Sequence, residues 1–174
     1  MTTVDVRGRV DAPSITPTVI EEDGTNATGL VITRAPTDGD EVTHYRITGI
    51  TGGTLYHADG VTVINDGDYI TVEQGSAGLK FVPAADQNSP AGGSFGFDVQ
   101  ASSGDDGVSL SPAVPAVITV TDVNDAPTAA DDVLAPATEG DGVIVIEFAD
   151  LLANDAKGPS DEAWQTLEIV EVGN

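Results

Sequence analysis

The segment VITVTDVNDAPTAADD, residues 117–132, joins a β-type alternation of apolar residues and threonines to a sudden run of oxygen-bearing side chains. Asp122, Asn124 and Asp125 fall within four residues, directly after the alternation and just before Pro127. Ca²⁺ is a hard cation that takes about six to eight oxygen ligands from carboxylates, amide carbonyls and the backbone. The motif offers oxygens only, and no His or Cys stands nearby to favour a softer metal. The spacing therefore predicts a calcium site.

A second interpretation fits the same residues. Asn and Asp also cap turns and solvate linkers without any metal. The two interpretations differ in energy, because crowded carboxylates repel each other and a bound cation would remove that repulsion. Extracellular modules bind calcium at roughly 10⁻⁴–10⁻³ M, an affinity that is useful only where calcium is plentiful. Both interpretations stay open at the level of the motif.

Composition narrows the classes of partner. The chain holds 29 Asp and Glu against 6 Lys and Arg, for a formal net charge of -23. A chain this acidic repels nucleic acid and anionic lipid head groups, so we expect neither as a partner. No apolar run approaches transmembrane length, which predicts no membrane insertion. The absence of Cys excludes disulfides and thiolate metal sites.

The hydrophobic period is two along most of the chain. In SFGFDVQA, for example, Phe95, Phe97 and Val99 fall on one face of the expected strand. Turn signals rich in Gly, Asp and Asn separate such runs, which predicts an all-β fold, an antiparallel Greek-key β-sandwich. No helical period of useful length appears before residue 148. The expected strands cover 15–20, 29–34, 42–48, 61–64, 69–73, 78–82, 94–101 and 116–123.

A weak internal echo indicates two domains. The N-terminal VDVRGRVDAP can be laid over ITVTDVNDAP, and about 114 residues separate the two closing prolines. An Ig-like sandwich needs about 100 residues. We therefore expect a preceding linker or strand end at 1–12, a β-sandwich repeat at 13–126, and the N-terminal part of a second β domain at 127–174. That last part offers strand-like runs at 143–149 and 166–172, with a helical turn at ADLLAN.

The phrase DVNDAP, and the opening ADDVLAPATEGDGVIVIEFADLLAND of the second domain, resemble the cadherin-like and bacterial Ig-like tandem repeats of large secreted or surface adhesins, including those of the RTX type. The resemblance implies a bacterial protein that is extracellular, secreted or on the cell surface. It implies neighbouring repeats of the same polypeptide as partners. It also implies Ca²⁺ as the cofactor, bound where consecutive domains meet.

The resemblance also implies a set of calcium ligands, with some departures. Asn88 stands where the family has Glu, Val10 and Gly8 weaken a site at the N-terminal junction, and Lys157 interrupts the aspartate-rich loop of the second domain. In that second domain Asp155, Asp161 and Glu162 are further candidates. The implied ligands are Glu21, Glu22, Asp38, Asp40, Asp86, Asn88, Asp122, Asn124 and Asp125.

The function that these observations predict is a calcium-binding structural module, an extender in a large exported adhesin. The alternative is an adhesion module that binds a carbohydrate or a surface protein, although the only Trp, Trp164, lies outside the first domain. We do not expect an enzyme. His44 and His57 lie in separate segments, and the chain has no nucleophile elbow, P-loop or His-Glu-x-x-His motif.

Overall fold

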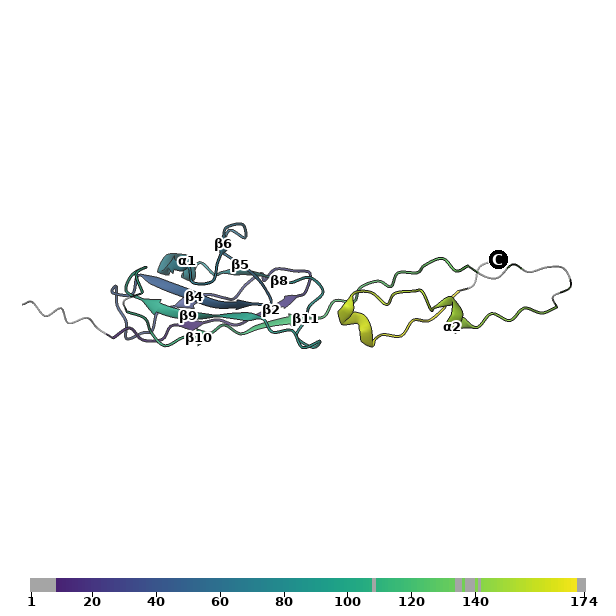
Figure 1. Ribbon diagram of the computed structural model, residues 1–174. Coiled ribbons are helices and arrows are strands. Elements are labelled where there is room, and N and C mark those ends of the chain that lie inside the picture. Colours follow the sequence, from purple (N-terminus) through teal and green to yellow (C-terminus); the bar gives the residue numbers. More distant parts are fainter. Residues whose placement is uncertain (1–8, 108, 134–135, 137–139, 141, 172–174) are drawn as a thin grey trace, which may run out of the picture. The chain divides into compact units, whose positions relative to one another are not determined.

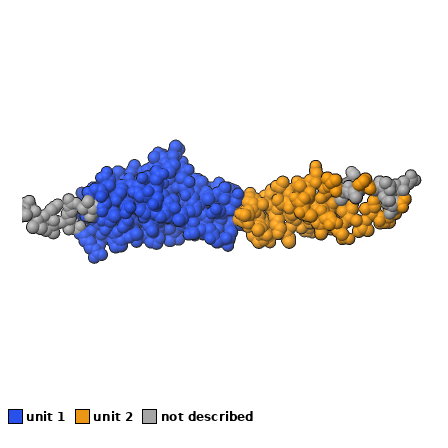
Figure 2. Space-filling view, in the orientation of Figure 1, with its two compact units in different colours: residues 1–123 blue, residues 124–174 orange. Residues whose placement is uncertain are grey.

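The computed structural model describes residues 9–107, 109–133, 136, 140 and 142–171 (Figure 1). The chain divides into two compact units, unit 1 at Met1–Val123 and unit 2 at Asn124–Asn174 (Figure 2). The boundary falls inside the DVNDAP phrase, close to the predicted domain end at residue 126.

Unit 1 consists mainly of short strands in several small sheets, which confirms the β-rich fold that the alternation predicted. The strand orders are β10-β9-β4-β7, β6-β5-β8, β1-β3 and β11-β2. The bounds are β1 (Ser14–Ile15), β2 (Thr18–Glu21), β3 (Ile32–Thr33), β4 (His44–Thr51), β5 (Gly53–Tyr56), β6 (Val63–Ile64), β7 (Tyr69–Thr71), β8 (Lys80–Pro83), β9 (Gly96–Ser102), β10 (Val114–Pro115) and β11 (Ile118–Thr121).

One hydrophobic core holds unit 1 together. The alternation behaves as predicted, because Phe95, Phe97 and Val99 are all buried on one face of β9 and its approach. Burial of each such side chain contributes about 1.5–3 kcal/mol. Val10 also belongs to this core. The packed unit therefore begins before Pro13, inside the segment 1–12 that was predicted to be a preceding linker or strand end.

The pair formed by β2 and β11 departs from the prediction of an antiparallel fold. These two strands pair in parallel, from Thr18 opposite Ile118 to Glu21 opposite Thr121. The other named strand pairs of the described residues are antiparallel. Periodicity reports which face of a strand is buried but not which strand lies beside it, so the sequence could not show this pairing. Parallel strands end at the same edge, and this places the residues after β2 and β11 together.

A short helix, α1 (Val72–Ser76), replaces the end of the strand predicted at 69–73. The hydroxyl of Thr71 accepts a hydrogen bond from the backbone N–H of Gln74, and the Gln74 side chain accepts one from the N–H of Thr71. This reciprocal capping box stabilises the first turn. At five residues α1 is too short to produce a helical period in the sequence, although its Thr-x-x-Gln capping signature is visible there.

Unit 2 is sparsely paired. It contains α2 (Phe148–Leu151), which falls in the predicted helical turn, a 3-10 helix η1 (Ser160–Trp164), and an isolated bridge between Thr128 and Ala156. The described residues of the runs at 143–149 and 166–172 form no strand, contrary to the prediction. A strand needs a partner for its backbone N–H and C=O groups, and these runs have no ladder in the described part of the unit. No helix in the described residues is long and apolar enough to span a membrane.

Candidate metal centre

Two carboxylates meet where the parallel strands of unit 1 end. Glu22 directly follows β2 and Asp122 directly follows β11, and the register of the pair brings the two residues side by side. Oxygens of the two side chains lie within 4.8 Å of each other. Glu22 is only 2% exposed, whereas Asp122 is exposed. Two like charges at this separation repel each other unless a cation or hydrogen bonds compensate.

Neutral N–H groups hold this pair in place. The backbone N–H of Val123 donates to Oε1 of Glu22 at 2.6 Å. The Nδ2 group of Asn88 donates to Oε2 of Glu22 at 3.2 Å and to Oδ1 of Asp122 at 3.0 Å. Asn88 is itself buried, so one amide bridges both acids from inside the unit.

The loop that carries Asn88 is tied to β11. The Oδ1 atom of Asn88 accepts the backbone N–H of Ala91 at 2.8 Å, so its carbonyl oxygen is turned toward its own loop. The next residue, Ser89, exchanges two bonds with Val120, from its N–H to the Val120 carbonyl at 2.9 Å and from the Val120 N–H to its hydroxyl at 3.0 Å. Asn88 therefore acts here as a donor that positions the two carboxylates.

Within the described residues, two other predicted ligands of unit 1 do not belong to the acidic cluster that contains Glu22 and Asp122. Glu21 is the last residue of β2, and its side chain is exposed because successive side chains of a strand point to opposite faces. Asp86 is half-buried in the turn after β8, where its backbone adopts a left-handed φ of 56°. Of the two neighbouring glutamates that the sequence offered, the structure brings Glu22 to Asp122.

The predicted linker ligands of unit 2 are held by η1 and the residue after it. Oδ1 of Asn124 accepts a hydrogen bond from Gln165 Nε2 at 3.0 Å. The backbone N–H of Asp125 donates to Oε1 of Glu162 at 3.0 Å, and Gln165 also donates to the other oxygen of Glu162. Glu162 is fully buried. The sequence named Glu162 only as a further candidate, and its role in unit 2 is to fix the start of that unit.

The remaining candidates of unit 2 are Asp155 and Asp161. Oδ1 of Asp155 accepts the backbone N–H of Ala130 at 2.8 Å. Asp161 is buried in η1.

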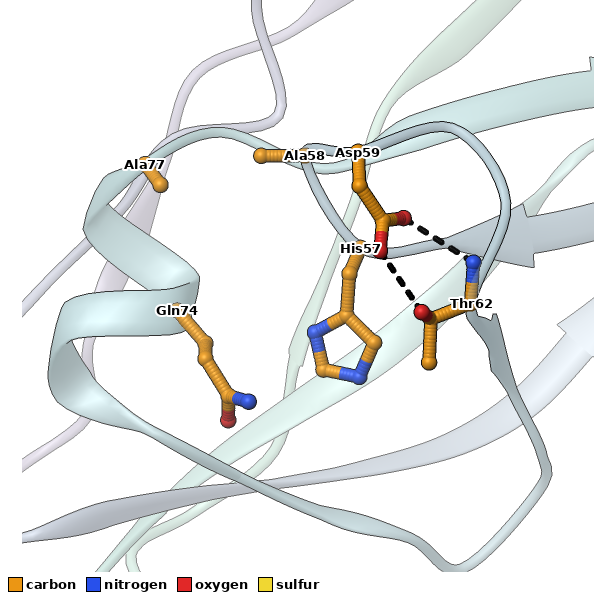
Figure 3. A pocket seen from close by; sticks show the side chains of 6 residues that line it. All are labelled: His57, Ala58, Asp59, Thr62, Gln74 and Ala77. Atoms are coloured by element: carbon orange, nitrogen blue, oxygen red, sulfur yellow. Dashed lines mark hydrogen bonds between the residues drawn. The ribbon is translucent and has the colours of Figure 1, made fainter.

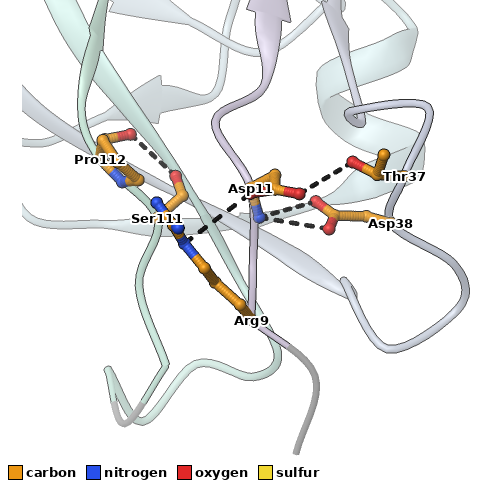
Figure 4. Close-up of polar contacts among 6 residues, drawn as sticks. All are labelled: Arg9, Asp11, Thr37, Asp38, Ser111 and Pro112. Atoms are coloured by element: carbon orange, nitrogen blue, oxygen red, sulfur yellow. Dashed lines mark hydrogen bonds and ion pairs between the residues drawn. The ribbon is translucent and has the colours of Figure 1, made fainter.

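At the other end of unit 1, Asp38 caps the entering chain (Figure 4). Both carboxylate oxygens of Asp38 accept the backbone N–H of Asp11, at 3.2 and 3.1 Å. The hydroxyl of Thr37 donates to Asp11 at 2.8 Å, and Arg9 Nε lies 3.9 Å from the same carboxylate. These contacts give the acids of this end partners within unit 1.

Asp40 lies beside Arg34, at the same end of unit 1. Its side chain is fully exposed, and its Oδ1 lies 3.4 Å from Nη1 of Arg34. The same guanidinium group donates to the carbonyl of Gly39 at 2.6 Å. The N–H of Gly39 in turn donates to Glu41, and this hydrogen bond lowers the pKa of the Glu41 carboxyl. The structure therefore places Asp38 and Asp40 in a turn whose charges are already partnered.

Unit 1 also has an open pocket of about 220 Å³ between the hairpin after β5 and helix α1 (Figure 3). The Asp59 carboxylate lines this pocket. It accepts hydrogen bonds from the hydroxyl of Thr62 and from the N–H groups of Thr62 and Val61. These hydrogen bonds lower the pKa of the Asp59 carboxyl to about 2, and the bond from the Thr62 hydroxyl contributes most. The residues that line the pocket are His57, Ala58, Asp59, Thr62, Gln74 and Ala77.

Comparison with known proteins adds little. No family model matches the chain, and no curated protein matches it either. Among solved structures, the chain is similar to the solution NMR structure of a conjugate transposon protein from Bacteroides vulgatus, with 18% sequence identity over 66% of this chain and 89% of that chain. The TM-score of this match is 0.39, too low to support an argument about fold or function.

Proposed function

We propose that the chain is a calcium-binding structural module, an extender from a large exported bacterial adhesin that works outside the cell. The observation behind this proposal is the buried carboxylate of Glu22 beside Asp122, at the edge of unit 1 from which the chain leaves toward Asn124 and Asp125. Bound calcium would stiffen the stretch between neighbouring repeats of the same polypeptide.

The donor set suits calcium. Glu22 and Asp122 would hold the ion with carboxylate oxygens, and Asp125 follows within three residues of Asp122 in the sequence. Asn88 would orient both carboxylates through its amide N–H group, as ligating carboxylates commonly need. The ion would supply positive charge that removes the repulsion between the acids. Magnesium fits less well because it demands near-ideal octahedral geometry and loses its water reluctantly.

We further propose that unit 1 is a Greek-key β-sandwich of the cadherin or Ig-like kind, and that unit 2 is a partial second β domain. Support comes from the core, to which separate sheets contribute fully buried side chains. Tyr45 and Val99 come from the sheet of β4 and β9, and Leu55 and Phe81 from the sheet of β5 and β8. One core covered by two sheets is the arrangement of a sandwich.

A thermal melt tests the calcium proposal. We expect the chain to melt several degrees higher in millimolar calcium than in chelator, because a ligand that binds only the folded state stabilises it by about 2.7 kcal/mol at a hundredfold excess over Kd. Magnesium should raise the melting temperature less. Equal melting temperatures in calcium, magnesium and chelator would contradict the proposal.

The alternative proposal is an adhesion module for a carbohydrate or a surface protein, and the open pocket beside His57 is the observation that favours it. A glycan array probed with the whole chain tests this alternative. Binding that His57→Ala abolishes would favour it over the extender. An array without signal would leave carbohydrate recognition unsupported.

A further inference from the structure

The segment that enters unit 1 and the segment that leaves it each form two strands in succession. The entering segment pairs first with β3, through β1, and then with β11, through β2. The leaving segment pairs first with β9, through β10, and then with β2, through β11. The entering segment and the leaving segment therefore pair with each other, through β2 and β11.

Hydrogen bonds close this pair at both ends. At its start, the backbone N–H of Thr18 donates to the carbonyl of Val117 at 3.1 Å. At its finish, the N–H of Glu22 donates to the carbonyl of Thr121, also at 3.1 Å. Figure 1 shows β2 and β11 lying side by side within unit 1.

Tension along the polypeptide would load this pair in a particular way. The chain reaches β2 at Thr18 and leaves β11 at Thr121, and because the strands are parallel these two points lie at opposite ends of the ladder. A pull on both sides of the unit therefore drags the strands in opposite directions along their common axis. The ladder bonds run between the strands, across the pull, so they are stretched together rather than opened one after another.

We propose that the β2–β11 pair is a mechanical clamp, and that unit 1 bears tension transmitted along the polypeptide. This function goes beyond calcium binding, because the strand topology provides it whether or not a metal is bound. Resistance to forced unfolding depends on the barrier to unfolding and not on equilibrium stability. A clamp loaded in shear raises that barrier because several bonds must break in one step.

Neighbouring contacts reinforce the clamp. The far side of β11 is bound by Ser89 through both the N–H and the carbonyl of Val120. Side chains from both strands, Ile20 from β2 and Ile118 and Val120 from β11, are buried in the core. Sliding the strands past each other therefore requires moving core side chains as well as breaking the ladder.

Single-molecule force spectroscopy on the whole chain tests the clamp. In the first geometry the handles are attached at the two chain termini, which shears the pair. In the second, one handle is attached at Asp23→Cys, an exposed position just after Glu22, and the other at the C-terminus. This geometry pulls the finishing ends of β2 and β11 apart and opens the ladder bond by bond. The chain has no Cys, so the introduced thiol is unique.

We expect unit 1 to unfold at a several-fold higher force in the first geometry than in the second. The difference should persist in chelator, which separates the clamp from the calcium proposal. Equal forces in the two geometries, or a higher force in the second, would overturn the clamp. A thermal melt shows whether Asp23→Cys impairs folding. If it does, attachment at Thr25→Cys, which is also an exposed position, gives the same comparison.

A matched pair of variants tests the ladder itself. Val19 and Thr119 stand opposite each other, and both side chains are exposed. The N–H of Val120 faces Ser89, so by alternation the N–H of Thr119 faces β2, whereas the N–H of Val19 faces away from β11. Thr119→Pro should lower the unfolding force between the termini much more than Val19→Pro. An equal loss of unfolding force in both variants would contradict a ladder that bears the tension.

Discussion

The two ends of unit 1 both gather acidic side chains but compensate them differently. Where the chain enters, Asp11 and Asp38 contact a backbone N–H, a hydroxyl and Arg9, and Asp40 lies beside Arg34. Where the chain leaves, the contacts that join Glu22 and Asp122 come from neutral N–H groups. The acids of the entering end therefore have cationic partners within the chain. Under the calcium proposal, the metal ion would take at the leaving end the place that the arginines hold at the entering end.

The largest difference between the two ends should appear when the buried acid of the leaving end is neutralised. Glu22→Gln keeps the side-chain shape but removes a proposed carboxylate ligand. We expect calcium affinity to fall by more than the roughly 10–100-fold that loss of an outer-shell partner costs. Without calcium the free energy of unfolding should fall by about 1–3 kcal/mol, because both oxygens of the buried Glu22 accept N–H bonds and the amide nitrogen of Gln cannot accept one. Calorimetric titration and thermal melts measure both, with Glu21→Gln as the exposed control.

The bridging amide should have the next largest effect. Asn88→Ala removes the N–H group that holds both acids, and we expect a loss of about 10–100-fold in calcium affinity. The free energy of unfolding should also fall by about 1–3 kcal/mol with or without calcium, because buried acceptors lose their partner. Gln87→Ala, at an exposed neighbouring position, is the control. A variant with unchanged calcium affinity would show that Asn88 does not position the ligands.

At the entering end the expected effect is smaller and independent of calcium. Asp38→Asn weakens the acceptor of the Asp11 N–H and should lower the free energy of unfolding by about 1 kcal/mol. Urea denaturation with calcium and with chelator should give the same loss. Asp40→Asn should change little, since exposed ion pairs contribute about 0–1 kcal/mol. A loss that appears only with calcium would mean that this end also binds the metal.

The smallest effect tests whether the arginines cause the contrast. Arg9→Gln combined with Arg34→Gln leaves the acids of the entering end without their cations. We expect weak calcium binding to appear there, seen by NMR as shifts of the Asp11 and Asp38 amides at millimolar calcium. The parent chain should show no such shifts. If calcium does not shift these amides in the double variant, factors other than the arginines distinguish the two ends.

Much of unit 1 could be predicted from its sequence, because burial of one strand face imposes a period of two. The runs around Phe97 and Val120 became strands for this reason. The parallel pairing of β2 could not be predicted, since it depends on which strands meet in space. The runs of unit 2 at 143–147 and 166–171 are also strand-like in composition but form no strand, because a sequence pattern cannot provide the partner that a ladder requires.

The site was predictable in part. The spacing of Asp122 after a strand indicated one proposed ligand. The choice between Glu21 and Glu22 was available from alternation, because Ile20 faces the core and Glu22 shares its face. The role of Asn88 could not be predicted, since it depends on a loop folded from residues 34 positions away from Asp122.

Calorimetric titration of the whole chain with calcium tests the central claim most directly, with Asp122→Ala measured beside Asp105→Ala. Asp105 is an exposed acid in a loop away from the proposed ligands, so its variant should bind calcium as the parent chain does. We predict heat of binding for the parent and for Asp105→Ala, with a Kd near the 10⁻⁴–10⁻³ M that is typical of extracellular modules, and clearly weaker binding for Asp122→Ala. No binding by the parent, or equal binding by both variants, would contradict a calcium site at Glu22 and Asp122.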